Sequence, residues 1–161
     1  MAGFPEHYDE FDRARFKFVL ERLPKSGTFL DVGCGDGALT ELMCSEDRKV
    51  LGLDLEPNPW IAANATSIPF PDNEFDYVTA FEILEHLYDD DLPKAIAEIK
   101  RVAKKKIFVS VPVGRSIFHH SHLRFFTEAM LADIFPGADV EVMPVGGTRT
   151  LWFWMEWSCQ N

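Results

Sequence analysis

A glycine-rich segment flanked by carboxylates is the most prominent chemical feature of this sequence. It runs from Asp31 to Ala38 and reads DVGCGDGA, directly after a short apolar run. Glycines at this spacing allow a tight turn and let a ligand approach the backbone closely. The same spacing satisfies only the weaker G-x-G-x-x-A fingerprint, which also occurs in ordinary turns. The segment therefore predicts either a nucleotide-type binding loop or a plain tight turn.

A second acidic residue supports the binding-loop interpretation. Asp54 ends the apolar run VLGL, and it follows the loop by about 20 residues, where an acidic side chain meets the ribose hydroxyls of a ligand bound to a doubly wound sheet. A helix N-cap or a solvated strand end are the structural alternatives. Because a lone charge among apolar neighbours is costly, a functional reason is the better interpretation.

The acidity of the loop separates two kinds of adenosine ligand. A dinucleotide places its pyrophosphate at the helix N-terminus after such a loop, where Asp36 and the preceding Asp31 would repel it. The same carboxylates favour a ligand with an ammonium group and a positive sulfonium. We therefore expect S-adenosylmethionine rather than a nicotinamide dinucleotide.

The elements that must position these residues follow from hydrophobic periodicity. Two extended runs at the C-terminal end are separated by the turn-forming Gly146-Gly147. The alternation predicts right-handed crossovers and an α/β fold, a doubly wound, mainly parallel sheet with a C-terminal antiparallel hairpin. Strands are expected at 28–32, 50–55, 75–81, 107–111, 140–143 and 150–157, and helices at 9–23, 38–44, 89–102 and 127–134.

Composition limits the class of function. The 161 residues carry a net charge of −10, and such a field repels phosphate backbones and anionic lipid head groups. We therefore expect neither a nucleic-acid partner nor a role at a membrane surface. The longest uncharged apolar stretch, around Ile107 to Val113, is far shorter than the ~20 residues that a membrane span needs, so no span is expected. The three cysteines form no C-x-x-C pair and the first residues contain no apolar signal segment. We expect one cytoplasmic domain over residues 1–161.

Three motifs taken together resemble a known family. The segments DVGCGDG, LGLDLEPN and ATSIPFPDNEFDYVTAFEILEHL are similar to the successive motifs of class I S-adenosylmethionine-dependent methyltransferases. The nearest subgroup is the small-molecule branch with the ubiquinone/menaquinone-type methyltransferases, where HSHLRFFT also has a counterpart. The resemblance runs from about Phe11 to Phe126 and implies a seven-stranded Rossmann-like sheet.

This resemblance assigns roles to particular residues. Asp31 and the loop glycines would contact the methionine part of the cofactor, Asp54 the ribose hydroxyls, and Phe81 the sulfonium pocket. The cofactor-binding residues expected in this way are Asp31, Gly33, Cys34, Gly35, Gly37, Asp54, Leu55, Asn64, Ala65 and Phe81.

The sequence departs from the family pattern in two places. Asn64 and Ala65 align with the pair that reads the adenine edge, but an acid is usual where Asn64 stands. We expect the amide oxygen of Asn64 to accept a hydrogen bond from the adenine amine. The lysines at 104–106 replace a Pro-Gly-Gly turn that is common before the fifth strand, which leaves the course of the chain there open.

Candidate bases occur in two histidine-containing segments. Methyl transfer from a sulfonium is an in-line displacement that requires no fixed catalytic residue, but an oxygen or amine nucleophile can still need a base. The Glu85-His86 pair is expected to open the next helix, where a packing role is the alternative. A metal site is not expected, because H-H-x-H lacks a partnering Cys or Asp. The candidates are His86, His119 and His122, with His120, Glu82 and Glu85 nearby.

Three other side chains have two interpretations each. Arg124 either pairs with an anionic acceptor or makes a structural salt bridge. Tyr8 and Phe11 either close over the cofactor or pack in the core.

Together these patterns predict an enzyme that moves the methyl group of S-adenosylmethionine to an oxygen or nitrogen of a small molecule. The alternatives are a catalytically idle binding or regulatory subunit and a nicotinamide-dependent oxidoreductase. No Asp/Asn-Pro-Pro-aromatic motif follows residues 75–81, which argues against nucleobase amines as acceptors. No inserted substrate domain is expected, so the acceptor site is either open or completed by a homo-oligomer or a partner chain.

Overall fold

The computed structural model describes residues 8–55, 60–113, 121–143 and 152–159. Within these residues, no helix combines the length and the apolar character needed to cross a membrane. The helices are α1 (Glu10–Arg22), α2 (Ala38–Met43), α3 (Leu92–Val102) and α4 (Glu128–Ile134), with a 3₁₀ turn η1 (Leu84–His86). The strands are β1 (Gly27–Val32), β2 (Arg48–Asp54), β3 (Ile61–Ala62), β4 (Phe75–Phe81), β5 (Ala103–Pro112), β6 (Asp139–Met143) and β7 (Trp152–Ser158).

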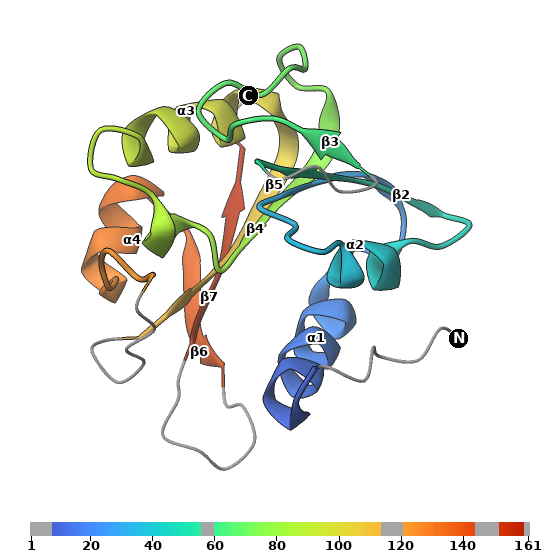
Figure 1. Ribbon diagram of the computed structural model, residues 1–161, viewed down its shortest axis with the longest axis horizontal. Helices are drawn as coiled ribbons and strands as arrows, with labels where there is room; N and C mark the ends of the chain where they lie inside the picture. Colours follow the sequence, from blue (N-terminus) through green and yellow to red (C-terminus); the bar gives the residue numbers. More distant parts are fainter. Residues whose placement is uncertain (1–7, 56–59, 114–120, 144–151, 160–161) are drawn as a thin grey trace.

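The strands form one sheet in the order β3-β2-β1-β4-β5-β7-β6 (Figure 1). Strands β1 to β5 run parallel to their neighbours, whereas β7 is antiparallel to both β5 and β6. This arrangement confirms the predicted α/β class, the mainly parallel sheet and the antiparallel C-terminal pair. Its chain order places a topological switch point between β1 and β4, and ligands of such sheets bind outside the carboxyl ends of the strands there.

The structure differs from the sequence-based elements in three places. The lysine run at 104–106 belongs to β5, because Lys105 and Lys106 reach the carboxylates of Asp76 and Glu156 from within the sheet. The short edge strand β3 was not predicted. Helix α3 begins at Leu92, three residues later than expected, with Asp91 as N-cap and a proline in its first turn.

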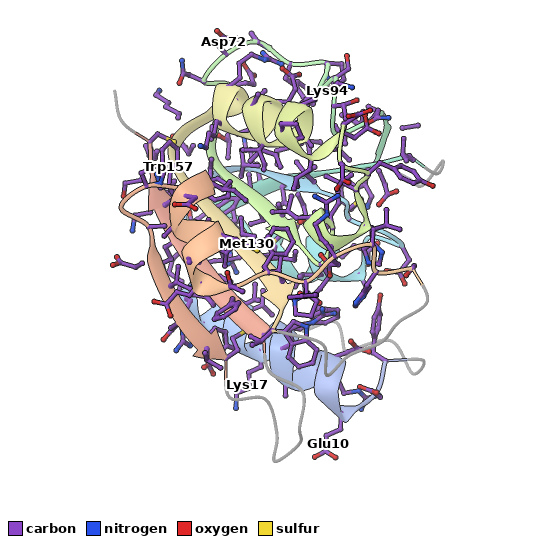
Figure 2. All side chains as sticks on the ribbon, turned by 90° about the vertical axis from the view of Figure 1, so that its left-hand side faces the viewer. Glu10, Lys17, Asp72, Lys94, Met130 and Trp157 are labelled. Carbon is purple, nitrogen blue, oxygen red and sulfur yellow. The ribbon has the colours of Figure 1, made fainter. Side chains whose placement is uncertain are left out.

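Each face of the sheet has its own apolar core. Helices α1 and α2 cover one face and contribute Val19, Leu23 and Met43. Helices α3 and α4 cover the other face, where Ile99 and Leu131 are fully buried. In Figure 2, Lys94 marks α3 near the top of the view, and Glu10 and Lys17 mark α1 at the bottom. Because both faces are covered, the parallel strands carry apolar runs in their buried parts, such as residues 107–109 of β5.

In the loop between β1 and α2, two structural features require a glycine at the position of Gly33. Its φ of 75° lies in the left-handed region, which residues with a Cβ adopt only with strain. A Cβ at this position would also lie 2.8 Å from Cβ of Ile83, directly after β4. Gly35 shares the positive φ, at 57°, but a Cβ there would meet nothing within 4 Å. Gly33 therefore lets the loop pack closely against the end of β4.

Gly33→Ala and Gly35→Ala form a matched pair that separates backbone strain from close packing. We expect Gly35→Ala to lower the free energy of unfolding by about 1 kcal/mol, the cost of a left-handed alanine. Gly33→Ala adds a clash with Ile83 and should cost about 2–4 kcal/mol in total. Urea unfolding of both variants measures the difference. Equal losses would contradict the close contact between the loop and Ile83.

Candidate functional site

Two adjoining cavities lie at the carboxyl ends of β1, β2 and β4. The first has a volume of about 220 Å³ and the second about 350 Å³. Gly33, Gly35 and Glu82 line both cavities, so the glycine loop and the end of β4 form their common wall. Small-molecule sites usually span roughly 300–1,000 Å³, and the two cavities together fall in this range. Their position at the switch point is where the fold is expected to bind a ligand.

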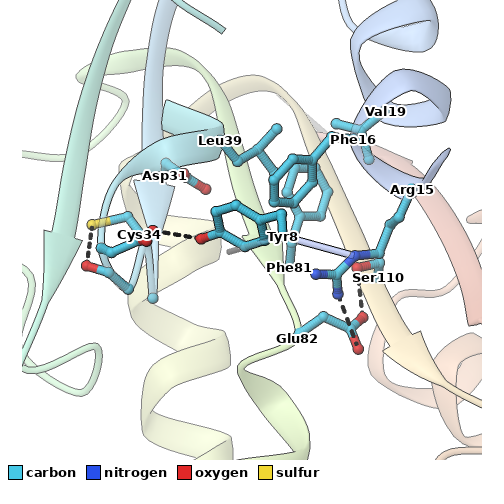
Figure 3. A pocket seen from close by; sticks show the side chains of 13 residues that line it. Tyr8, Arg15, Phe16, Val19, Asp31, Cys34, Leu39, Phe81, Glu82 and Ser110 are labelled. Carbon is cyan, nitrogen blue, oxygen red and sulfur yellow. Dashed lines mark hydrogen bonds and ion pairs between the residues drawn. The ribbon is translucent and has the colours of Figure 1, made fainter. Parts of the chain in front are cut away.

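The first cavity lies between the glycine loop and helix α1 (Figure 3). Asp31, Cys34 and Asp36 line it from the loop side, and Phe81 lines it from the end of β4. The Phe81 ring stacks on Trp154, with ring centroids 5.6 Å apart. Carboxylates and an aromatic wall therefore meet in one space.

Asp31 is a buried carboxylate held by two hydroxyls. Its side chain is 3% exposed, and it accepts hydrogen bonds from Thr40 Oγ1 at 2.6 Å and from Thr79 Oγ1 at 2.7 Å. Burial raises the pKa of Asp31 to about 6, although both hydroxyls favour the ionised form. The hydroxyls come from α2 and β4, so this carboxylate ties the strand, its neighbour and the next helix together. A cation in the first cavity would relieve the cost of ionising it.

Glu82 forms part of the wall between the two cavities in a strained backbone conformation. Its φ is 55°, and non-glycine residues in this region are concentrated at functional sites. Ser110 Oγ and Trp152 Nε1 donate hydrogen bonds to its carboxylate at 2.8 and 2.6 Å, and the Arg15 guanidinium lies 3.4 Å away. Burial raises the pKa of Glu82, while Arg15 opposes this shift.

The second cavity is largely apolar, with Asp54 at its edge. Leu53, Leu55, Ile83 and Leu87 are among its lining residues. The two oxygens of Asp54 accept hydrogen bonds from the backbone N–H groups of Gly35, at 2.8 Å, and Leu55, at 2.7 Å. The carboxylate is thereby fixed at the cavity edge next to the loop.

Asn64 and Ala65 also line the second cavity, but the amide of Asn64 differs from our expectation. Its oxygen accepts hydrogen bonds from the backbone N–H of Thr66, at 2.9 Å, and from Thr66 Oγ1, at 2.8 Å. Both lone pairs of that oxygen are therefore engaged in a local turn. The acceptor that we expected to face a ligand serves the loop instead.

Nine of the ten residues expected to bind a cofactor line these cavities. Gly37 is the exception. A Cβ at Gly37 would meet the Trp60 indole. The first cavity contains Asp31, Gly33, Cys34, Gly35 and Phe81, and the second contains Gly33, Gly35, Asp54, Leu55, Asn64 and Ala65.

The candidate bases are brought together only in part. His86 lines the second cavity, and its ring meets the His122 ring edge to face, with centroids 4.8 Å apart. His86 and Glu85 lie in η1 rather than in the first turn of a helix, because Leu87 is extended and separates η1 from α3. His119 and His120 lie outside the described residues.

Two of the side chains with double interpretations can be placed. Arg124 donates to the carbonyl of Leu87 at 2.6 Å and to Asp89 at 2.8 Å, which is a structural role. Tyr8 lines the first cavity and donates to Asp36 at 2.6 Å. Burial and this hydrogen bond raise the pKa of Tyr8. The side chain of Phe11 lies outside what the structure describes.

Sequence reasoning missed Arg15, the one basic side chain among the described residues that line the first cavity. It pairs with Asp12 at 3.2 Å and with Glu82 at 3.4 Å. Arg15 is one of several charged residues in α1, and nothing in its local sequence distinguishes it. Only the packing of α1 over the carboxyl end of β4 identifies it.

Comparisons with known proteins give a consistent family. Residues 30–109 match the family described as the methyltransferase domain. Over 122 residues the chain is 34% identical to demethylmenaquinone methyltransferase from Bacillus licheniformis, covering 65% of this chain and 50% of that protein. It is 33% identical over 113 residues to ubiquinone biosynthesis O-methyltransferase from Hahella chejuensis, covering 59% and 47%. The chain thus spans about half the length of these curated relatives.

Solved structures share the fold at lower identity. 1,6-didemethyltoxoflavin-N1-methyltransferase from Burkholderia thailandensis, solved with S-adenosylhomocysteine and 1,6-didemethyltoxoflavin, superposes with a TM-score of 0.78 and 19% identity, covering 96% of this chain and 80% of that one. N-methyltransferase NodS from Bradyrhizobium japonicum, solved with S-adenosylhomocysteine, gives a TM-score of 0.78 and 16% identity, covering 99% and 94%.

Asp31→Asn should change how stability depends on pH. Because the folded-state pKa of Asp31 is raised to about 6 from an ordinary value of 3.8, wild-type stability is lost as the pH rises from about 4 to about 6. The variant lacks this loss, so its free energy of unfolding relative to wild type should increase by about 2.5 kcal/mol between pH 4 and pH 8. Urea unfolding at both pH values measures the change. All other groups titrate in both proteins, so a difference that does not vary with pH would contradict this account of Asp31.

Proposed function

We propose that this chain, whose residues 30–109 match the methyltransferase domain family, transfers the methyl group of S-adenosylmethionine to an oxygen or nitrogen of a small molecule. The observation that carries the proposal is the pair of adjoining cavities, one acidic and one apolar, at the switch point of the sheet. Relatives and structural neighbours named as small-molecule methyltransferases support it.

The first cavity fits the methionine part of this cofactor. Asp31, Asp36 and Glu82 supply carboxylates that attract an ammonium group and a sulfonium. Arg15 offers a guanidinium for the cofactor's own carboxylate. Phe81, stacked on Trp154, presents an aromatic face beside these groups, and a sulfonium is attracted to such a face. Both charges of the methionine part therefore have complementary partners.

The second cavity fits the adenosine part. Asp54 stands at its edge, where a carboxylate accepts hydrogen bonds from the ribose hydroxyls. The apolar side chains of Leu53, Leu55 and Ile83 suit a planar base. Each Asp54 oxygen accepts one backbone N–H, from Gly35 or Leu55, and its second lone pair is available to a ribose hydroxyl. Since the oxygen of Asn64 is engaged with Thr66, shape and apolar contact carry more of the adenine recognition than we expected from the sequence.

Methyl transfer requires the protein mainly to position the reacting groups. The acceptor's lone pair attacks the methyl carbon, the carbon–sulfur bond breaks, and its electrons return to sulfur as the neutral thioether. The side chains at the carboxyl ends of β1 and β4 hold the sulfonium and exclude water. The acceptor's proton passes to solvent or to a base, and His86 is the candidate among the described residues because it lines the second cavity. The proposal includes a small-molecule acceptor. Its acceptor site is either open or completed by another chain.

Two alternatives make different predictions. A catalytically idle subunit would bind the cofactor poorly or methylate no acceptor, and the local engagement of the Asn64 oxygen is the observation that favours it. An oxidoreductase would bind NAD, whose pyrophosphate the carboxylates of Asp31 and Asp36 would repel.

Calorimetric titration of the chain with S-adenosylmethionine and S-adenosylhomocysteine tests the proposal. We expect saturable binding of both in the micromolar range and no competition from NAD. Release of S-adenosylhomocysteine in the presence of small hydroxy and amino compounds would report turnover. If neither S-adenosylmethionine nor S-adenosylhomocysteine binds, the proposal is refuted. Binding of NAD alone would favour the oxidoreductase.

Asp54→Ala should weaken S-adenosylhomocysteine binding by roughly 10- to 100-fold, because hydrogen bonds to a charged acceptor contribute about 1.5–3 kcal/mol. The matched control is Glu41→Ala, an exposed carboxylate in α2 that lines neither cavity. The same calorimetric titration measures both variants. An affinity of Asp54→Ala equal to that of the control would remove the ribose role of Asp54.

A further inference from the structure

A buried carboxylate without a hydrogen-bond partner lies next to His86, which lines the second cavity. The side chain of Glu85 is 0% exposed, and neither of its carboxylate oxygens has a hydrogen-bond partner among the described residues. A buried polar group left in this state costs free energy, and buried charges in proteins are as a rule paired or bound to metals. The proposed methyl transfer and the packing of η1 do not account for this carboxylate.

Two imidazoles face this carboxylate. The ligand atoms of Glu85, His86 and His122 all lie within 4.8 Å of one another, and His86 Nε2 is 4.0 Å from Glu85 Oε1. The rings of His86 and His122 meet edge to face at 4.8 Å. Two nitrogens and a carboxylate thus converge on one small volume.

Hydrogen bonds between main-chain segments fix this arrangement. The backbone N–H of Leu123 donates to the carbonyl of Glu85 at 2.8 Å, and Arg124 donates to the carbonyl of Leu87 at 2.6 Å. His86 Nδ1 lies 3.0 Å from the carbonyl of Ser121. Residues 121–124 are therefore held against η1 on both sides of His122, so its ring is kept beside Glu85 and His86.

The contact with Ser121 also determines which nitrogen of His86 is available. A carbonyl oxygen only accepts hydrogen bonds, so Nδ1 of His86 must carry the proton. In the neutral ring Nε2 then has a free lone pair, and Nε2 is the atom on the side of Glu85. Metal-binding histidines are typically oriented in this way, with the other ring nitrogen donating to a backbone carbonyl.

We propose that Glu85, His86 and His122 bind one divalent transition-metal ion. Two imidazole nitrogens and one carboxylate suit Zn²⁺, Mn²⁺, Fe²⁺ or Co²⁺ better than Mg²⁺ or Ca²⁺, which prefer sets of oxygens alone. An ion would pair both with the buried Glu85 carboxylate and with the imidazoles. Three protein ligands leave at least one coordination position of such an ion for a water or another oxygen.

The ion would lie at the wall of the second cavity, because His86 lines it. If the chain methylates a small molecule as proposed above, His86 would hold the ion instead of acting as the base, and an acceptor hydroxyl at the open position would have its pKa lowered by the ion. This consequence rests on the proposed function, whereas the metal site itself does not.

The competing explanation is a neutral Glu85. Burial, followed by the nearby charge of Glu82, raises the pKa of Glu85 to about 9. A protonated carboxyl without a bound ion would then be the resting state, and the three side chains would show no affinity for metals. Binding measurements separate these two states directly.

The test is a pair of titrations of the chelator-treated chain. Mn²⁺ binding is measured through the electron paramagnetic resonance signal of the free ion, and Co²⁺ binding is measured by calorimetry. Mn²⁺ disfavours thiolates, so the three cysteines, none of which is in a disulfide, do not obscure the result. We expect one Mn²⁺ per chain and a rise in melting temperature with the ion. The proposal would be overturned if neither Mn²⁺ nor Co²⁺ bound saturably.

Glu85→Gln and His122→Ala should each weaken metal binding by more than roughly 10-fold, the scale on which even indirect changes at metal sites act. Glu85→Gln removes a buried carboxylate, so its melting temperature without metal should be no lower than that of wild type. Loss of binding in this variant then cannot be attributed to unfolding. Glu41→Gln, which changes an exposed carboxylate of α2, is the matched control and should bind as wild type does.

Unchanged binding in both Glu85→Gln and His122→Ala would overturn the assignment of the ligands. The titrations contain no S-adenosylmethionine, so failure of the metal site leaves cofactor binding untouched. Conversely, a chain that binds the metal but no S-adenosylmethionine would refute the proposed function and keep the metal site.

Discussion

The meeting of β1 and β4 at the middle of the sheet is the constraint on which the rest of the structure depends. The chain leaves β1 toward β2 and β3 and then returns to the other side of β1 as β4. The segments that follow β1 and β4 must therefore diverge to opposite faces, and the space between them holds both cavities. The Asp31 carboxylate lies at this junction and binds hydroxyls from β4 and α2. Its two hydrogen bonds keep the walls of the opening in register.

A second property of the site is its concentration of poorly solvated negative charge. Asp31, Glu82 and Glu85 each have a pKa raised by burial. Of the three, Glu82 is the one that forms an ion pair with a guanidinium, that of Arg15 at 3.4 Å. Ionising buried carboxyl groups at this end of the sheet costs free energy. Positively charged ligands bound there would reduce that cost. The proposed cofactor and the proposed metal ion are two cations that would act in this way at neighbouring points.

The sequence predicts the parts of this protein whose signals are local. The alternating periodicities predict the sheet and its helices, and the glycine loop with Asp54 predicts the cofactor side of the site. Contacts between distant segments are not predictable in this way. Arg15 enters the first cavity because α1 packs over the sheet, and His122 meets Glu85 because residues 121–124 bond to η1. The H-H-x-H segment lacks a local partner in sequence, and the carboxylate near His122 comes from η1, after β4.

The bonds that hold residues 121–124 against η1 have a consequence for how this site can diverge. At two of them, Leu123 N–H to Glu85 carbonyl and His86 to Ser121 carbonyl, residues 121–124 contribute only main-chain groups. Any residue except proline at 123 provides the first bond, and any residue at 121 provides the second. The exposed side chain of Leu123 can therefore vary without loss of this backbone bond. The contact with η1 is thus encoded by the backbone, and sequence change at position 123 leaves it in place.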